Sequence, residues 1–257
     1  VIPVGQSLEL GPGCIVYVGG EYTTITVFGQ IIARGTKEEP VVFMSARTSP
    51  KPWDWDRIYC RSRTGSQFEH CIIRHSNYGI VVENGSVLIK HSLFENNSIS
   101  GLVVKNAEAS LSSAIFKGGH LVALNIRPNG VVIADSLTIK ENITGIACDT
   151  FATLQLNNGI ISNNSNGLVV SNDNAVKIVA VDITKNRFGV ISNKDIPRKT
   201  REMVFGNGLD LKVSDTTEIY AILRDPQVVK SIAATKSITS VERKNFTPGF
   251  SALSAPQ

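Results

Sequence analysis

Two tryptophans and two aspartates stand next to one another and are the residues of this sequence best suited to bind a ligand. The four are Trp53, Asp54, Trp55 and Asp56. Aromatic faces stack on sugar rings, and neighbouring carboxylates accept hydrogen bonds from sugar hydroxyls. A Ser-Pro-Lys-Pro segment comes just before them, which is typical of a loop. The run predicts a carbohydrate-binding loop, with the alternative that one tryptophan packs against the side of the fold.

The elements that position such a loop follow from a repeat of 22 residues. Its units begin at Gly79, Gly101, Gly145, Gly167 and Gly189, with Ala123 at the place of the missing member. Each unit holds three short runs rich in Val, Ile and Leu, separated by Asn, Ser and Gly, which predicts strands and turns. One unit cannot bury its own apolar face, but stacked units can, with equivalent strands paired in parallel about 4.8 Å apart.

The repeat therefore predicts an all-β solenoid of roughly eight to ten coils. Its interior is expected to hold a stack of aliphatic side chains, namely Ile80, Leu102, Leu124, Ile146, Leu168 and Val190. Polar residues keep the same period. One predicted ladder of side chains contains Ser98, His120, Asn142, Asn164 and Asn186, and a second contains Asn84, Asn106 and Asn172. Stacked amides can hydrogen-bond from one coil to the next.

Together with its N-terminal third, the repeat resembles the right-handed parallel β-helix family, whose solenoid is also that of pectate lyases and polygalacturonases. Three N-terminal segments are similar to those of bacterial exported or surface β-helix proteins: residues 5–13, residues 29–43 and the Trp-containing residues 53–58. The resemblance covers about residues 1–200 and implies a single-stranded right-handed parallel β-helix. It implies little about function, because the family shares coils rather than one active site.

The two enzyme activities found on this fold need constellations that the sequence lacks. A pectate-lyase-like site requires several carboxylates converging on Ca²⁺, together with a base. The acidic column Glu83, Asp149 and Asp173 is interrupted by Lys105 and by Pro128 or Asn129. A polygalacturonase-like site requires an Asp-Asp pair and a Gly-His-Gly motif, and the sequence has neither. No catalytic residue, metal site or cofactor is predicted, with weakly bound Ca²⁺ kept as an alternative that the sequence does not support.

The histidines and cysteines give no further site. His70, His75, His91 and His120 are interpreted as turn histidines, since His75 and Glu141 would lie three coils apart. The cysteines Cys14, Cys60, Cys71 and Cys148 lack the spacing of a zinc or redox motif, and three of them sit in apolar runs. They are therefore expected to be buried free thiols.

Beyond residue 197 the repeat is lost. We predict a β-helix over residues 1–200 and a C-terminal cap and tail over residues 201–257, with a short helix at 226–234 and a linker as the alternative for 240–257. The basic residues Lys185, Arg187, Lys194, Arg198, Lys199 and Arg201 favour a solvated cap, with an anionic polysaccharide as the alternative.

Composition limits the remaining choices. The 257 residues carry 26 Lys and Arg against 22 Asp and Glu, an excess too small to indicate nucleic-acid binding. No apolar run is long enough to cross a bilayer. Because the sequence starts at Val1, we expect a mature or trimmed chain whose export signal lies outside it. We expect an extracellular or cell-surface location, and a monomer or a part of a larger multidomain chain.

Three hypotheses for function follow. The first is a non-catalytic exported or cell-surface module that presents a rigid face to a polysaccharide or a surface partner. The second is a polysaccharide lyase or glycoside hydrolase with an atypical site. The third is a structural spacer or stalk of a larger surface protein.

Overall fold

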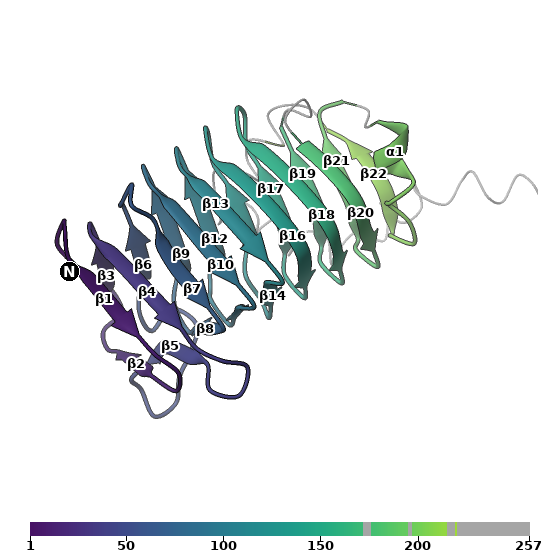
Figure 1. The fold of residues 1–257 in the computed structure, drawn as a ribbon. Helices are drawn as coiled ribbons and strands as arrows, with labels where there is room; N and C mark the ends of the chain where they lie inside the picture. The colour runs from purple at the N-terminus through teal and green to yellow at the C-terminus, as the bar shows by residue number, and fades with distance from the viewer. Residues whose placement is uncertain (172–175, 195–196, 215–218, 220–257) are drawn as a thin grey trace, which may run out of the picture.

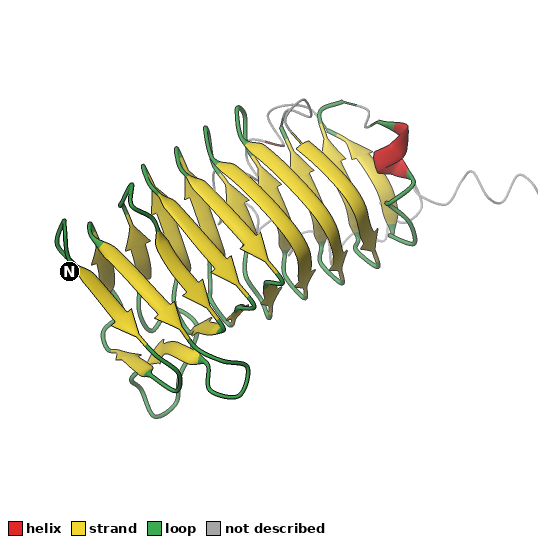
Figure 2. Cartoon of the chain, in the orientation of Figure 1, coloured by secondary structure: helices red, strands yellow, loops and turns green. Residues whose placement is uncertain are grey.

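The computed structural model describes residues 1–171, 176–194, 197–214 and 219. These residues form 22 strands and one helix of a single turn, so the all-β prediction is confirmed (Figure 1 and Figure 2). The strands belong to two parallel sheets that wind around a common axis. The helix, α1 (Arg198–Arg201), lies at the far end of the stack.

The smaller sheet, sheet A, receives one strand from each coil. From the N-terminal end its strands are β3 (Thr24–Val27), β6 (Arg57–Cys60), β9 (Tyr78–Glu83), β12 (Ser100–Lys105), β15 (Val122–Ile126), β17 (Thr144–Cys148), β19 (Asn166–Val170), β21 (Phe188–Ser192) and β22 (Leu209–Val213). Neighbours in this order are hydrogen-bonded. Nine strands correspond to nine coils, within the predicted range of eight to ten.

The larger sheet, sheet B, covers the other two faces. Its strands are β1 (Ser7–Leu10), β2 (Ile15–Val18), β4 (Gln30–Arg34), β5 (Val41–Ser45), β7 (Ser66–Glu69), β8 (Cys71–Arg74), β10 (Ser86–Lys90), β11 (Leu93–Glu95), β13 (Glu108–Ser112), β14 (Ile115–Lys117), β16 (Val131–Lys140), β18 (Thr153–Ser162) and β20 (Val176–Thr184). Early coils break at the corner between these two faces, whereas β16, β18 and β20 run through it. Left-handed residues make that bend, among them Ser136 at φ 58° and Asn158 at φ 53°.

The interior follows the predicted period. The six residues expected to stack, from Ile80 to Val190, pair in register from strand to strand and are at most 1 % exposed. Each coil thus places an aliphatic side chain directly on the one before it, which buries apolar area without any helix. The stack predicted from the 22-residue repeat is confirmed.

The glycines of the repeat lie where sheet A comes closest to the interior. A Cβ at Gly145 would stand 2.6 Å from the carbonyl oxygen of Gly167 and 2.9 Å from Cγ2 of Ile161. Gly79 has the same relation to Gly101, at 2.4 Å. The column therefore needs very small residues, because the next coil's backbone and an opposing core side chain fill the space.

Replacing Gly145 with valine is expected to lower the free energy of unfolding by about 2–4 kcal/mol, since three added carbons meet backbone that cannot move alone. Thermal and urea unfolding measure the loss. Ala123→Gly, in the same column, is the matched control and is expected to cost about 1 kcal/mol or less. Equal stability of the valine variant and the parent would contradict the inward placement of this column.

A polar ladder, buried from Ser76 to Asn186, runs along one corner. Its side chains are Ser76, Asn97, His120, Asn142, Asn164, Asn186 and Asn207, linked from coil to coil. The prediction of Ser98 in this ladder was wrong: Ser98 donates to Asn77 Oδ1 at 3.1 Å, and Asn97 takes its place. The reason is that the position whose side chain points inward shifts by one residue between these two coils, from Asn97 to His120. The strands before and after this corner keep their register.

The coils continue past the predicted boundary at residue 200. β22 pairs with β21 in parallel, and Val204 bridges Ile183, so the solenoid extends to Val213. The repeat is hidden here because the step shortens to 21 residues, as between Asn186 and Asn207. The predicted helix at 226–234 and the tail at 240–257 lie outside the described residues.

The cysteines are free, as predicted. Cys60, Cys71 and Cys148 are buried, and Cys14 is half-buried. Burial raises the pKa of each of the three buried thiols to about 12, so they are neutral and pack as small apolar groups.

Candidate functional site

The two predicted tryptophans have opposite environments. Trp55 is completely buried, and its Nε1 donates a hydrogen bond to the carbonyl of Arg74 at 3.0 Å. Trp53 is 52 % exposed and has a left-handed backbone, with φ of 76°. Its N–H donates to the carbonyl of Ser76 at 3.2 Å, which fixes this uncommon conformation. Only Trp53 therefore offers an aromatic face to a ligand, and Trp55 anchors the loop.

The two predicted aspartates hold the loop in place. Asp54 is 3 % exposed; its carboxylate accepts hydrogen bonds from Ser45 Oγ at 2.7 Å and the Lys51 N–H at 2.9 Å, and lies 3.2 Å from Arg47 Nε. Although burial would raise the pKa of Asp54, the hydrogen bonds and Arg47 together lower it. Asp54 is thus ionised and fully engaged. The sequence suggested that all four residues could contact a ligand. In the structure Asp54 and Trp55 are buried and support the loop, whereas Trp53 is exposed.

The fourth residue, Asp56, lies immediately before β6 of sheet A. Its carboxylate accepts a hydrogen bond from Thr24 Oγ1 at 2.9 Å and pairs with Arg57 Nε at 2.7 Å. The Arg57 guanidinium in turn lies 4.4 Å from the centre of the Tyr78 ring. Asp56 thereby positions the first cation of the neighbouring surface.

The outer face of sheet A carries a hollow of about 500 Å³ over β6, β9 and β12. The outward side chains of Val81 and Val103 form its floor, and each is 7 % exposed. On one side, where the strands begin, lie Arg57 and the partly exposed ring of Tyr78, while Tyr59 stands in register with the two valines on the neighbouring strand. On the other side lie the charged residues Glu83, Lys105, Arg127 and Asp149. An apolar floor between an aromatic side and a charged side is typical of a binding site; we name it the sheet A hollow.

The central contact of the sheet A hollow is a shared carboxylate. Tyr59 Oη donates a hydrogen bond to one oxygen of Glu83, and Lys105 Nζ lies 2.8 Å from the other. These contacts lower the pKa of Glu83, with Lys105 the largest cause. Burial, followed by the Glu83 carboxylate, raises the pKa of Tyr59. At neutral pH Glu83 is therefore a carboxylate and Tyr59 a neutral phenol.

Two further cations lie in the hollow and beside it. Arg61 lies 5.6 Å from the centre of the Tyr59 ring, and Arg127 lines the hollow. In the part of the chain that the structure describes, neither guanidinium has an acidic side chain within ion-pair distance. The guanidinium geometry suits the binding of carboxylate and other oxyanions.

The column of acidic residues that the sequence analysis considered for Ca²⁺ contains partly different residues in the structure. The strand register places Glu83, Lys105, Arg127 and Asp149 on successive coils. Arg127 is therefore the second interrupting residue, rather than Pro128 or Asn129, and Asp173 lies outside the described residues. Across the described segments, no three His, Cys, Asp or Glu side chains gather closely enough to hold a metal ion.

The far half of the outer face of sheet A is covered. Outward-facing Ala147, Val169 and Ile191 are at most 2 % exposed and cluster with Phe188 and with Ile219, which is itself fully buried. This part of the face is a second small core. The open part of sheet A is therefore its N-terminal half, where the hollow lies.

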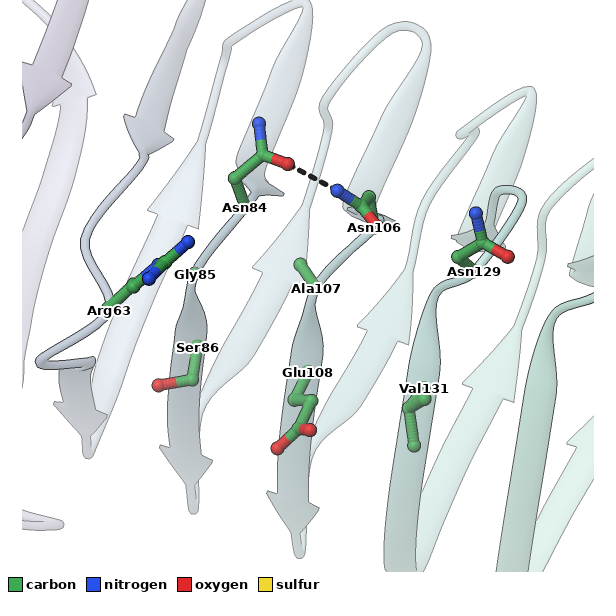
Figure 3. Close-up of a pocket in the computed structure, with 9 residues that line it drawn as sticks. All are labelled: Arg63, Asn84, Gly85, Ser86, Asn106, Ala107, Glu108, Asn129 and Val131. Atoms are coloured by element: carbon green, nitrogen blue, oxygen red, sulfur yellow. Dashed lines mark hydrogen bonds between the residues drawn. The ribbon is translucent and has the colours of Figure 1, made fainter.

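A second hollow, of about 450 Å³, lies at the turn after sheet A (Figure 3). Figure 3 shows Asn84, Asn106 and Asn129 on successive coils, with Arg63 and Glu108 nearby. Asn106 Nδ2 donates to Asn84 Oδ1, as the predicted second ladder requires. Asn129 occupies the next coil, and the predicted member Asn172 lies outside the described residues. The lining offers amides but no aromatic face, so it suits hydrogen bonding rather than stacking.

Sequence reasoning missed the most informative residues of the sheet A hollow. Arg57, Tyr59, Tyr78 and Arg127 were not singled out, because each is unremarkable in its own unit of the repeat. A usable signal was present: Tyr59, Val81 and Val103 occupy the outward column beside the buried Ile58, Ile80 and Leu102. Comparing the outward-facing positions of successive repeat units would have identified these residues as neighbours on one face of sheet A.

No curated protein matches the chain. In the described part of the structure, no helix has the length and apolar character that crossing a bilayer requires. A family model described as "Right handed beta helix region" matches residues 56–201, more than half of the chain. The matched segment contains the coils from β6 to α1, including the sheet A hollow. The chain therefore belongs to the right-handed β-helix family.

Proposed function

We propose that this protein is a non-catalytic module of an exported or cell-surface protein that binds an acidic polysaccharide on the outer face of sheet A. The observation that carries this proposal is the meeting of the Tyr59 and Tyr78 rings with the Arg127 guanidinium around an apolar floor, with the Arg61 guanidinium 5.6 Å from the centre of the Tyr59 ring. Aromatic faces bind the apolar faces of sugar rings, and guanidinium groups bind their carboxylates. Trp53, in the loop that leads into β6, offers a further exposed ring.

The rigidity of the solenoid favours binding of a long ligand. Every coil repeats the last at one strand spacing, so the site is held by hydrogen bonds of sheet A on both sides. A polymer bound there loses its own freedom but requires little reordering of the protein, which improves affinity.

The test is binding of polygalacturonate and alginate, compared with uncharged cellulose oligosaccharides, by affinity electrophoresis and calorimetry. We expect the carboxylated polymers to bind, with affinity that falls as salt is added. Tyr59→Ala and Arg127→Ala are each expected to weaken binding about tenfold or more. Tyr17→Ala, which removes a 63 % exposed ring on β2, is the matched control and should bind as the parent does. If Tyr59→Ala and Arg127→Ala bound the polymers as tightly as Tyr17→Ala and the parent do, the sheet A hollow would be rejected as the site.

The contact group of Tyr59, Glu83 and Lys105 favours a second candidate, an atypical polysaccharide lyase. In such an elimination the Glu83 carboxylate would take the proton beside the sugar carboxyl, and the Tyr59 phenol or Lys105 would give a proton to the leaving oxygen as its bond to carbon breaks. Release of unsaturated products from the same polymers, abolished by Lys105→Ala, would support it. Binding without product release favours the module, and no binding to any polymer favours a spacer.

A further inference from the structure

Two histidines that the proposed function does not use lie together at the corner between the two faces of sheet B. His70 follows β7 and His91 follows β10. The paired residues on both sides, Glu69 with Lys90 and Ile72 with Leu93, place the two histidines in register on adjacent coils. Both have the same left-handed backbone, with φ of 47° and 48°. Their rings are stacked, 4.8 Å between centroids and 15° between planes.

The turn itself does not require imidazole. In the following coils the same place is taken by Ser113, Ser136, Asn158 and Ala180, with φ between 52° and 58°. Serine, asparagine and alanine thus build the same bend, so the two imidazoles are free for another role. His91 is exposed and His70 is half-buried. Among the described residues, neither ring has a hydrogen-bond or ion-pair partner.

The other two histidines differ. His120 is fully buried in the polar ladder, with Asn142 Oδ1 2.6 Å from its Nδ1. His75 lies at another corner, with its Nδ1 buried and unpaired. Neither has a second imidazole stacked on it, so the pair of His70 and His91 is distinct within the described structure.

We propose that His70 and His91 together bind one divalent transition-metal ion, with Cu²⁺ preferred to Ni²⁺. Imidazole is a good ligand for both ions, and binding strength rises from Ni²⁺ to Cu²⁺ for a given nitrogen site. A metal–nitrogen bond of about 2.0–2.1 Å requires the two nitrogens to approach within about 4 Å. Because the lone pair of each nitrogen lies in the plane of its ring, the stacked rings must rotate about their side-chain bonds until the two lone pairs converge on the ion. The exposed His91 ring has the room to make most of this rotation.

The coordination is open rather than closed. No third His, Cys, Asp or Glu side chain joins the pair in the described chain, so water completes the coordination shell. This composition distinguishes the site from a structural zinc site, which takes four protein ligands. The metal therefore binds without being needed for folding.

The experiment is titration of the full chain with CuCl₂ and with NiCl₂, followed by calorimetry and, for Cu²⁺, by electron paramagnetic resonance. We expect one tight ion per chain and hyperfine splitting from two nitrogens. His70→Ala and His91→Ala should each weaken binding about 100-fold, because one imidazole no longer holds the ion beside the other. The double variant, which has no imidazole left at this corner, should lose the binding at this site that either single variant retains.

A gain of affinity provides an independent test. Ser113 is in register with His91 on the next coil, so Ser113→His adds a third imidazole to the column. It should bind Cu²⁺ at least about tenfold tighter, with Ser113→Ala unchanged from the parent. His91 is exposed, and His70 and Ser113 are half-buried at the same bend, so the unfolding midpoints of these variants without metal should agree closely with that of the parent. Parent-like binding by either single histidine variant, or a tight site that survives in the double variant, would overturn the proposal.

Discussion

Replacing Trp55 with alanine is expected to lower the free energy of unfolding by about 3–5 kcal/mol. The side chain is fully buried in the main core, and the change leaves a large cavity there. It also leaves the Arg74 carbonyl without its indole donor, which stands 3.0 Å away in the parent. Thermal unfolding and urea titration followed by circular dichroism measure the loss.

Trp53→Ala is the matched control for that variant. The two tryptophans are two residues apart, yet Trp53 is half exposed and packs against no core cluster. Its removal should change stability by less than about 0.5 kcal/mol, while any loss of polysaccharide affinity would identify the exposed ring as a contact. Equal destabilisation by both substitutions would show that the loop does not separate an anchor from a surface residue.

Stability is expected to fall by about 2 kcal/mol between pH 7 and pH 5 because of His120. Burial lowers the pKa of His120 from 6.5 to about 4, although its hydrogen bond to Asn142 acts in the opposite direction. Between pH 6.5 and about pH 4 His120 is protonated in the unfolded chain but neutral in the folded chain. The free energy of unfolding therefore decreases as the pH falls from about 6.5 toward 4, and the contribution is retained above pH 6.5.

The ladder explains why His120 stays neutral. Nδ1 lies 2.6 Å from Asn142 Oδ1. Because that oxygen can only accept a hydrogen bond, the proton of the neutral ring is placed on Nδ1. Nε2 is then left to accept from Asn97 Nδ2 at 3.4 Å. A second ring proton would face that amide donor inside a buried column, with no carboxylate beside it.

His120→Asn is the decisive variant. An asparagine at this place can donate to Asn142 as Asn142 donates to Asn164, but it does not titrate. Urea unfolding at pH 7, 6 and 5 should show a flatter pH dependence than that of the parent, whatever the stability at pH 7. His75, whose pKa burial also lowers, leaves a smaller slope in the same direction. An unchanged slope in the variant would assign the pH dependence to other groups.

Much of the fold was predictable because it is periodic. A 22-residue repeat that carries an aliphatic residue and a small residue at constant positions can bury its apolar side only by stacking. Ile80, Leu102 and Leu124 therefore had to lie one above the other in the interior. The prediction failed where the step changes length. Asn207 and β22 follow a step of 21 residues, and the pair of His70 and His91 is also 21 residues apart.

The sequence by itself determined the coil, its period, its aliphatic interior and most of the amide ladder, because each depends on residues that meet their own equivalents one coil away. Only the tertiary structure decided which chemical groups face each other: that Trp55 is buried and Trp53 exposed, and that Tyr59 meets Glu83 and Lys105. These contacts join unlike units, and their geometry depends on loop lengths and on the direction in which each corner turns its side chains. No periodicity records that information, so it appears only when the coils are assembled.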